Sequence, residues 1–316
     1  MKSLECDILD YYRKLSSYLN GGPYDPGYYP VCEQKKSCNM QTYFVSDKAP
    51  PEYDIIRSHF ARLLESYPEL LSNVIFHGSY GDFTNVSYSD LDFILLVTED
   101  SLKLRRTRKR LRQIMLGEVF PFIYRIDPLQ HHGAFWLWPA LQRRYCQDIL
   151  PICVYEKSWA VYPETVELNV MEIERAPRAP RLMELVEREY SYLVAHPKDS
   201  YAMKCFLSHI MILPCLYFGD INQHMYKAQS FRPFYERFGG LSRWVRTASR
   251  MRWLWPSTKT QLGYFLPLHR LSRVLGPRYP IFIGKAVRLP EDKISMSEFR
   301  RQDFKMLRRR LENELL

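Results

Sequence analysis

The sequence has no long uninterrupted apolar run. Its longest apolar stretch, residues 206–218, is too short to span a bilayer and contains Ser208 and His209. The first twelve residues carry acidic side chains and lack the apolar segment of a secretion signal. We therefore expect a soluble, cytoplasmic protein with no membrane partner.

The sequence also lacks a regular set of cysteines. Its 7 cysteines are odd in number and scattered, which indicates reduced thiols rather than a disulfide framework. Cys32 and Cys38 are the closest pair, with no second pair and no histidine couple nearby, and this argues against zinc. Internal repeats and low-complexity segments are absent too.

What the chain has is a large apolar fraction and an uneven charge. It is 46% hydrophobic over 316 residues, enough for a sizeable core and for two domains. Residues 227–316 hold 20 lysines and arginines against 7 aspartates and glutamates, whereas the rest of the chain is slightly acidic. A basic C-terminal third favours a polyanionic partner, either a nucleotide or a nucleic acid.

The hydrophobic spacing predicts an α+β fold. Pro177 and Pro180 mark a boundary between residues 1–177, with a small mixed sheet, and residues 178–316, which read as mainly helical. In the first part we expect helices over 4–18, 51–67 and 101–116, strands over 73–77, 90–97 and 119–126, and a long loop over 20–50.

One short pattern carries the chemistry. A predicted strand ends in His77, Gly78 and Ser79 follow as a turn, and ten residues later Asp90 and Asp92 open the next strand. Glycine lets a phosphate approach the backbone closely, and serine adds a hydroxyl donor. Residues two apart on a strand face the same side, so the two carboxylates would repel unless a cation lies between them. Mg²⁺, with Mn²⁺ as the alternative, is the cation that suits carboxylates and phosphate oxygens.

The pattern Gly78-Ser79 followed by Asp90-Leu91-Asp92 resembles the signature of the DNA polymerase β-type nucleotidyltransferase superfamily, and most closely its small stand-alone branch. The resemblance covers residues 55–130. It implies that residues 1–177 form a palm-like nucleotidyltransferase domain in which Gly78 and Ser79 bind the triphosphate. It also implies that Asp90 and Asp92 bind the catalytic metals.

In this superfamily a third carboxylate on a later strand completes the site. Asp127, at the end of the predicted strand 119–126, is the first candidate for this catalytic and metal-binding position, with Asp148 and Glu156 behind it. The helical domain of such enzymes often gives a lysine and a serine to the triphosphate. Lys227 and Ser230 are the candidates for those roles, with a solvated lysine as the alternative.

Two further groups are open to more than one interpretation. His131 and His132 follow Asp127 closely and either line the same cleft or are ordinary surface or core histidines. Arg243, Arg246 and Arg250 share one helical face among tryptophans, which suits nucleic-acid contact or a solvated face.

The favoured function is transfer of a nucleoside monophosphate from a nucleoside triphosphate to a small molecule, a protein or an RNA, with release of pyrophosphate. A relative that binds nucleotide or RNA without turnover is the alternative. A less favoured alternative is a glycosyltransferase that uses Asp90 and Asp92 to bind a nucleotide sugar. The Gly78-Ser79 turn argues against it, because such an enzyme does not need that turn. A purely structural role, with Asp90 capping a strand and Asp92 paired to an arginine, would leave a buried carboxylate pair without a cation, which is costly.

Overall fold

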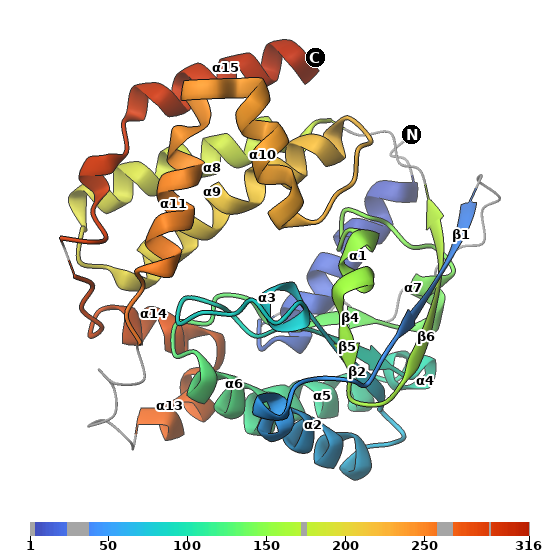
Figure 1. Ribbon diagram of the computed structural model, residues 1–316. Coiled ribbons are helices and arrows are strands. Elements are labelled where there is room, and N and C mark those ends of the chain that lie inside the picture. The colour runs from blue at the N-terminus through green and yellow to red at the C-terminus, as the bar shows by residue number, and fades with distance from the viewer. Residues whose placement is uncertain (1–3, 24–37, 172–175, 258–267, 291, 316) are drawn as a thin grey trace.

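The computed structural model describes residues 4–23, 38–171, 176–257, 268–290 and 292–315. Its first half is built around two small sheets, and its second half is a group of helices (Figure 1). The α+β class predicted from the sequence is confirmed. The mainly helical character of the part after residue 178 is also as expected.

The larger sheet has four strands in the order β4-β3-β2-β5. β3 runs antiparallel to β2 and parallel to β4, and β2 also pairs antiparallel with β5. A separate two-stranded antiparallel sheet joins β1 to β6. The strands are β1 (Cys38–Val45), β2 (Leu71–His77), β3 (Asp92–Val97), β4 (Phe135–Leu137), β5 (Trp159–Ala160) and β6 (Glu164–Met171).

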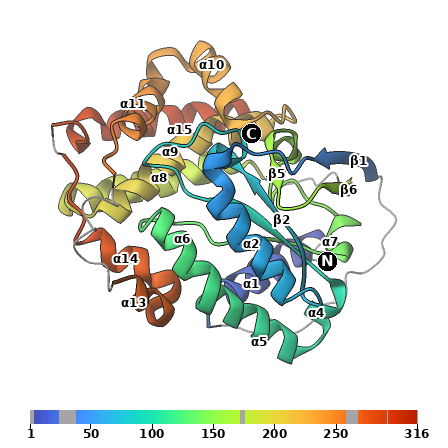
Figure 2. The same ribbon diagram turned by 60° about the horizontal axis from the view of Figure 1, so that its bottom comes forward.

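Helices cover one face of the larger sheet (Figure 2). They are α2 (Asp54–Ser66), α5 (Arg105–Ile114) and α6 (Phe120–Ile126). The ring of Phe60 on α2 lies 5.2 Å from that of Phe76 on β2 and 5.3 Å from that of Phe93 on β3, between ring centroids. The apolar spacing that predicted α2 from the sequence is thus the face that this helix buries. Shorter helices in this half are α3 (Gly78–Gly81), α4 (Glu99–Lys103) and α7 (Pro139–Gln142), and α1 (Leu4–Leu19) precedes the sheets.

Two predictions for this half are wrong. The predicted strand 119–126 is helical: α5 continues through a π-helical segment (Met115–Val119) into α6. Its buried side chains include those at the helical spacing of 119, 120, 123 and 124, and a short apolar run does not distinguish this spacing from a strand. The predicted loop 20–50 contains β1, and residues 24–37 of it lie outside the described residues.

The helical half is organised around α9 (Ser200–Asp220), whose first turn is capped by the Asp199 carboxylate. This helix packs against several of the other helices of this half, and it also lies next to the sheet half. α9 is long and apolar enough to cross a membrane, but 61% of its apolar window is buried inside the protein, as in a core helix. The other helices are α8 (Arg178–Ala195), α10 (Lys227–Phe238), α11 (Arg243–Trp253), α13 (Leu268–Leu275), α14 (Tyr279–Gly284) and α15 (Arg301–Leu315).

Candidate active site

The strand directions bring the sequence motif to one edge of the larger sheet. β2 ends at His77, whose Cα pairs with that of Asp92 at the start of the antiparallel β3. β4 runs parallel to β3, with Ile94 opposite Phe135, so the residues just before β4 reach the same edge. Gly78, Asp92 and the His131-His132 pair therefore meet there, although they lie far apart in the sequence.

Gly78 is required by its backbone and by its neighbour. Its φ of 63° lies in the left-handed region, and a Cβ built there would lie 2.6 Å from Oδ2 of Asp92. Only glycine adopts this φ without strain and leaves room for the carboxylate. The Tyr226 hydroxyl, which comes from just before α10, donates to the Gly78 carbonyl at 2.9 Å and ties the turn to the helical half.

Asp90 is a buried carboxylate that lies between Lys204 and His131. Its Oδ1 lies 2.9 Å from Nζ of Lys204, and its Oδ2 lies 2.7 Å from Nδ1 of His131. Burial alone would raise the pKa of Asp90, but His131 and Lys204 hold the pKa well below its usual range. Asp90 is therefore a carboxylate rather than a carboxylic acid at neutral pH.

Asp127 lies at the C-terminal end of α6 and not at the end of a strand, as the sequence suggested. Its Oδ2 accepts a hydrogen bond from Nζ of Lys204, and its Oδ1 accepts one from the Leu129 amide at 3.0 Å. Burial raises the pKa of Asp127 to about 7, against the opposing effect of Lys204. Lys204 thus connects Asp127 to Asp90.

Asp92 faces Gly78 from the first position of β3. Burial and then the nearby Asp90 raise the pKa of Asp92 to about 7, while Lys227 and Lys204 oppose this shift. In the absence of a cation this carboxylate therefore holds a proton well above the pH at which an exposed aspartate releases it.

Lys204 is a residue of this cluster that sequence reasoning missed. Its side chain is fully buried (0% exposed) near the N-terminal end of α9. Burial lowers the pKa of Lys204, but Asp127 and Asp90 more than offset this, so the pKa lies above its usual value and the ammonium keeps its charge. The one signal in the sequence is a lone lysine within an apolar helix, because a buried charge needs a partner.

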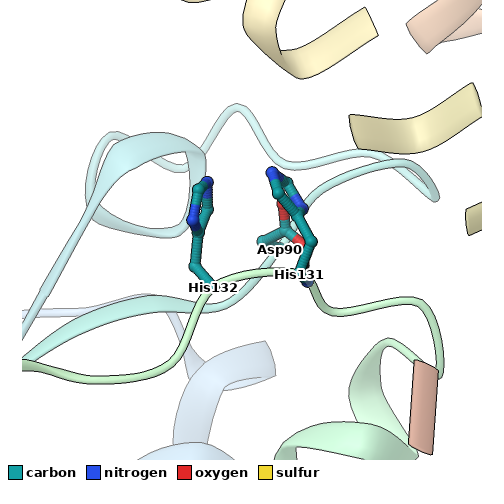
Figure 3. Close-up of side chains that lie close together, drawn as sticks. All are labelled: Asp90, His131 and His132. Carbon is teal, nitrogen blue, oxygen red and sulfur yellow. Dashed lines mark hydrogen bonds and ion pairs between the residues drawn. The ribbon is translucent and has the colours of Figure 1, made fainter. Parts of the chain in front are cut away.

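His131 and His132 complete the group (Figure 3). Among the described residues, Asp90, His131 and His132 form the one cluster of three potential metal ligands whose donor atoms all lie within 4.8 Å of one another. Nε2 of His131 is buried and has no hydrogen-bond partner. Burial holds the pKa of His132 well below its usual value, so its ring is neutral and able to ligate a metal.

The residues present fit a divalent cation, though not through the ligand set expected from the sequence. One carboxylate and two imidazoles suit a transition metal better than Mg²⁺, which prefers oxygen ligands. Asp92 and Asp127 flank this group, and the nearest cation to Asp127 is Lys204.

The other candidate residues fall into two sets. Lys227 is the exposed first residue of α10 and is close enough to influence the pKa of both Asp92 and His77. Ser79 follows Gly78 in α3 and is half-buried. In contrast, Ser230 is fully buried, and its hydroxyl donates to the Lys227 carbonyl at 2.6 Å within α10.

Asp148 and Glu156, the alternatives for the third carboxylate, have contacts or exposure that differ from those of Asp127. Asp148 lies 3.1 Å from a guanidinium nitrogen of Arg178, and Glu156 is an exposed residue of a 3₁₀ helix. On the basic face, Arg243 pairs with Asp303 at 2.6 Å and Arg250 pairs with Glu298. Two of the three arginines suggested for nucleic-acid contact are therefore held by acidic side chains.

Comparison of the chain with protein-family models, with curated proteins and with solved structures gave no match.

Proposed function

We propose that this protein is a metal-dependent nucleotidyltransferase, which moves a nucleoside monophosphate from a nucleoside triphosphate to an acceptor and releases pyrophosphate. The observation that carries the proposal is the fit between Gly78 and Asp92. A left-handed glycine with no room for a side chain lies against a carboxylate, at the sheet edge where Asp90 also lies. A backbone turn beside paired carboxylates is the arrangement that a metal-bound triphosphate requires.

Each residue of the site then has a part in binding the phosphates, in holding the cation or in positioning another side chain. Gly78 and Ser79 offer backbone and hydroxyl donors to the β- and γ-phosphates, and Lys227 lies near enough to neutralise them. Asp90, His131 and His132 would hold the cation, which would neutralise charge on the phosphates in transfer. Asp92 lies against the Gly78 turn and close to Asp90, so its carboxylate would add negative charge beside the same cation. Asp127 does not hold the cation directly, because its Oδ2 accepts a hydrogen bond from the Lys204 ammonium. Its role is to position Lys204 beside Asp90.

The donor atoms favour Mn²⁺ over Mg²⁺ as the activating cation. Asp90 is accompanied by two imidazoles, and nitrogen ligands bind Mn²⁺ more readily than Mg²⁺. The acceptor is a hydroxyl or phosphate on a small molecule, a protein or an RNA. We place the reaction in the cytoplasm.

The test is pyrophosphate release from each of the four ribonucleoside triphosphates, with Mn²⁺ or Mg²⁺, in the presence of cell metabolites, protein and RNA as acceptors. Asp92→Asn should abolish release while the protein stays folded. Asp10→Asn is the matched control, because Asp10 is an exposed carboxylate of α1 that pairs with Lys14 at 2.5 Å. Equal release by the Asp92→Asn variant and the wild type would contradict the assignment.

A nucleotide-binding protein without turnover is the second candidate function. It is favoured by Lys204, whose ammonium already bridges the carboxylates of Asp90 and Asp127 without any metal. Triphosphate binding that depends on Gly78 and Lys227, with no pyrophosphate from any acceptor, would support this candidate over the enzyme.

A further inference from the structure

Among the described lysines and arginines, Lys204 is the most deeply buried, with a side chain that is 0% exposed. Its Nζ lies 2.9 Å from Oδ1 of Asp90, contacts Asp127, and lies 5.3 Å from the centre of the Tyr88 ring. The Tyr88 hydroxyl donates to the Lys204 backbone carbonyl at 2.7 Å, so both ends of the residue are fixed. Burying an ammonium costs several kcal/mol, so these contacts must offset a large penalty.

The two oxygens of Asp90 face different partners. Oδ1 contacts the Lys204 ammonium, which comes from the helical half, whereas Oδ2 lies beside His131 on the loop before β4. The cluster formed by Asp90, His131 and His132 therefore lies on the Oδ2 side. The buried Nε2 of His131, which has no hydrogen-bond partner, is a second and independent sign of a ligand on that side.

The charges in this cluster are consistent with one divalent cation. The Lys204 ammonium already places one positive charge between two of the three carboxylates, those of Asp90 and Asp127. A second divalent cation would leave excess positive charge in a buried site, and the space between Asp90 and Asp127 already holds an ammonium.

We propose that Lys204 acts as a built-in second cation, so that the site binds one divalent metal ion through Asp90, His131 and His132 rather than two. The role of that site in catalysis rests on the proposed function, but the number of metal ions does not. Lys204 is a positioning residue here: it holds Asp90 and Asp127 in place and occupies the position that a second metal ion would need.

The experiment counts Mn²⁺ ions bound to the full chain without nucleotide, from the electron paramagnetic resonance signal of free Mn²⁺ during a titration. Wild-type protein should bind one Mn²⁺ ion per chain. Lys204→Met, which keeps the length of the side chain but removes its charge, should bind two. The matched control is Lys198→Met, an exposed lysine just before α9, which should bind one.

Two results would overturn the proposal. Two Mn²⁺ ions on the wild-type chain would show that Lys204 does not occupy the second position, and this result does not require the variant to fold. A folded Lys204→Met protein that binds one ion would leave Lys204 as only a structural tie between α9 and the sheet half. Failure of the proposed function is distinguishable, because it would appear as one bound ion without pyrophosphate release.

Discussion

Replacing Gly78 with alanine separates the two reasons for a glycine at this position. The first is conformational: a φ of 63° costs a non-glycine residue about 1–2 kcal/mol. The second is steric, because the new Cβ would lie 2.6 Å from Oδ2 of Asp92. To reach an ordinary contact the carboxylate must retreat by roughly 0.5–1 Å, since non-bonded heavy atoms prefer about 3.5 Å.

The two effects predict different readouts. The strain should lower the free energy of unfolding by about 1–2 kcal/mol, measured by urea denaturation. The displaced carboxylate should lower kcat by roughly 100-fold, because a shift of about 1 Å in a catalytic group has that effect. Pyrophosphate release with Mn²⁺ and saturating nucleotide measures this loss.

Gly239→Ala is the control for backbone strain. Gly239 also has a left-handed φ, of 53°, but a Cβ there meets nothing within 4 Å, and the residue ends α10 at the end opposite to Lys227. This variant should lose stability and keep full activity. Equal activity losses in the two variants, or a fully active Gly78→Ala protein, would refute the steric argument about Asp92.

Three other predictions concern the same site. Burial raises the pKa of Asp92 and Asp127 from 3.8 to about 7, so between these pH values the folded metal-free protein holds protons that the unfolded chain has released. The stability of the metal-free protein should therefore fall as the pH rises from about 4 to about 7, and excess Mn²⁺ should reverse the fall. Thermal melts that show no dependence of stability on pH would contradict these pKa shifts. His131→Ala should weaken Mn²⁺ binding by at least about 100-fold, since even supporting partners of a metal ligand are worth about 10- to 100-fold, and unchanged affinity in a Mn²⁺ titration would remove His131 from the site. Tyr226→Phe removes the donor to the Gly78 carbonyl and should cost about 1 kcal/mol in urea denaturation, while a loss below the precision of that measurement would mean that solvent replaces the bond.

The sequence predicted the helices and strands whose own apolar spacing is enough to define them. The apolar spacing of residues 51–67 predicted α2, and the apolar runs around the Gly78-Ser79 turn predicted β2 and β3. β6 was also predictable from its sequence, although it was not among the predicted strands. Val166, Leu168 and Val170 are buried and alternate with more exposed residues, which is typical of a half-buried strand.

The other elements depend on contacts between distant segments. β4 has three residues and β5 has two, so each is defined by its pairing with the longer strands rather than by a pattern of its own. The helical conformation of residues 119–126 follows from continuation of α5 and from packing against α13, which lies more than a hundred residues further along the chain.

In the candidate site, too, contacts between neighbouring strands were predictable from the sequence, whereas contacts between distant segments were not. The closeness of Gly78 to Asp92 follows from two neighbouring strands and was predictable. The contact of Lys204 with Asp90 was not, because 114 residues separate them and only the packing of α9 against the sheet half joins them. A buried lysine indicates that a partner exists, but sequence spacing does not identify it.

The most direct test of the central claim is to locate the phosphate bond that the protein breaks. Nucleoside triphosphate labelled at the α-phosphate and, separately, at the γ-phosphate is incubated with the protein, Mn²⁺ and a mixture of acceptors. If the protein is a nucleotidyltransferase, the γ-label leaves as pyrophosphate, the α-label enters the acceptor, and Asp92→Asn abolishes both. Release of the γ-label as inorganic phosphate, with the α-label left in nucleoside diphosphate, would contradict nucleotidyl transfer.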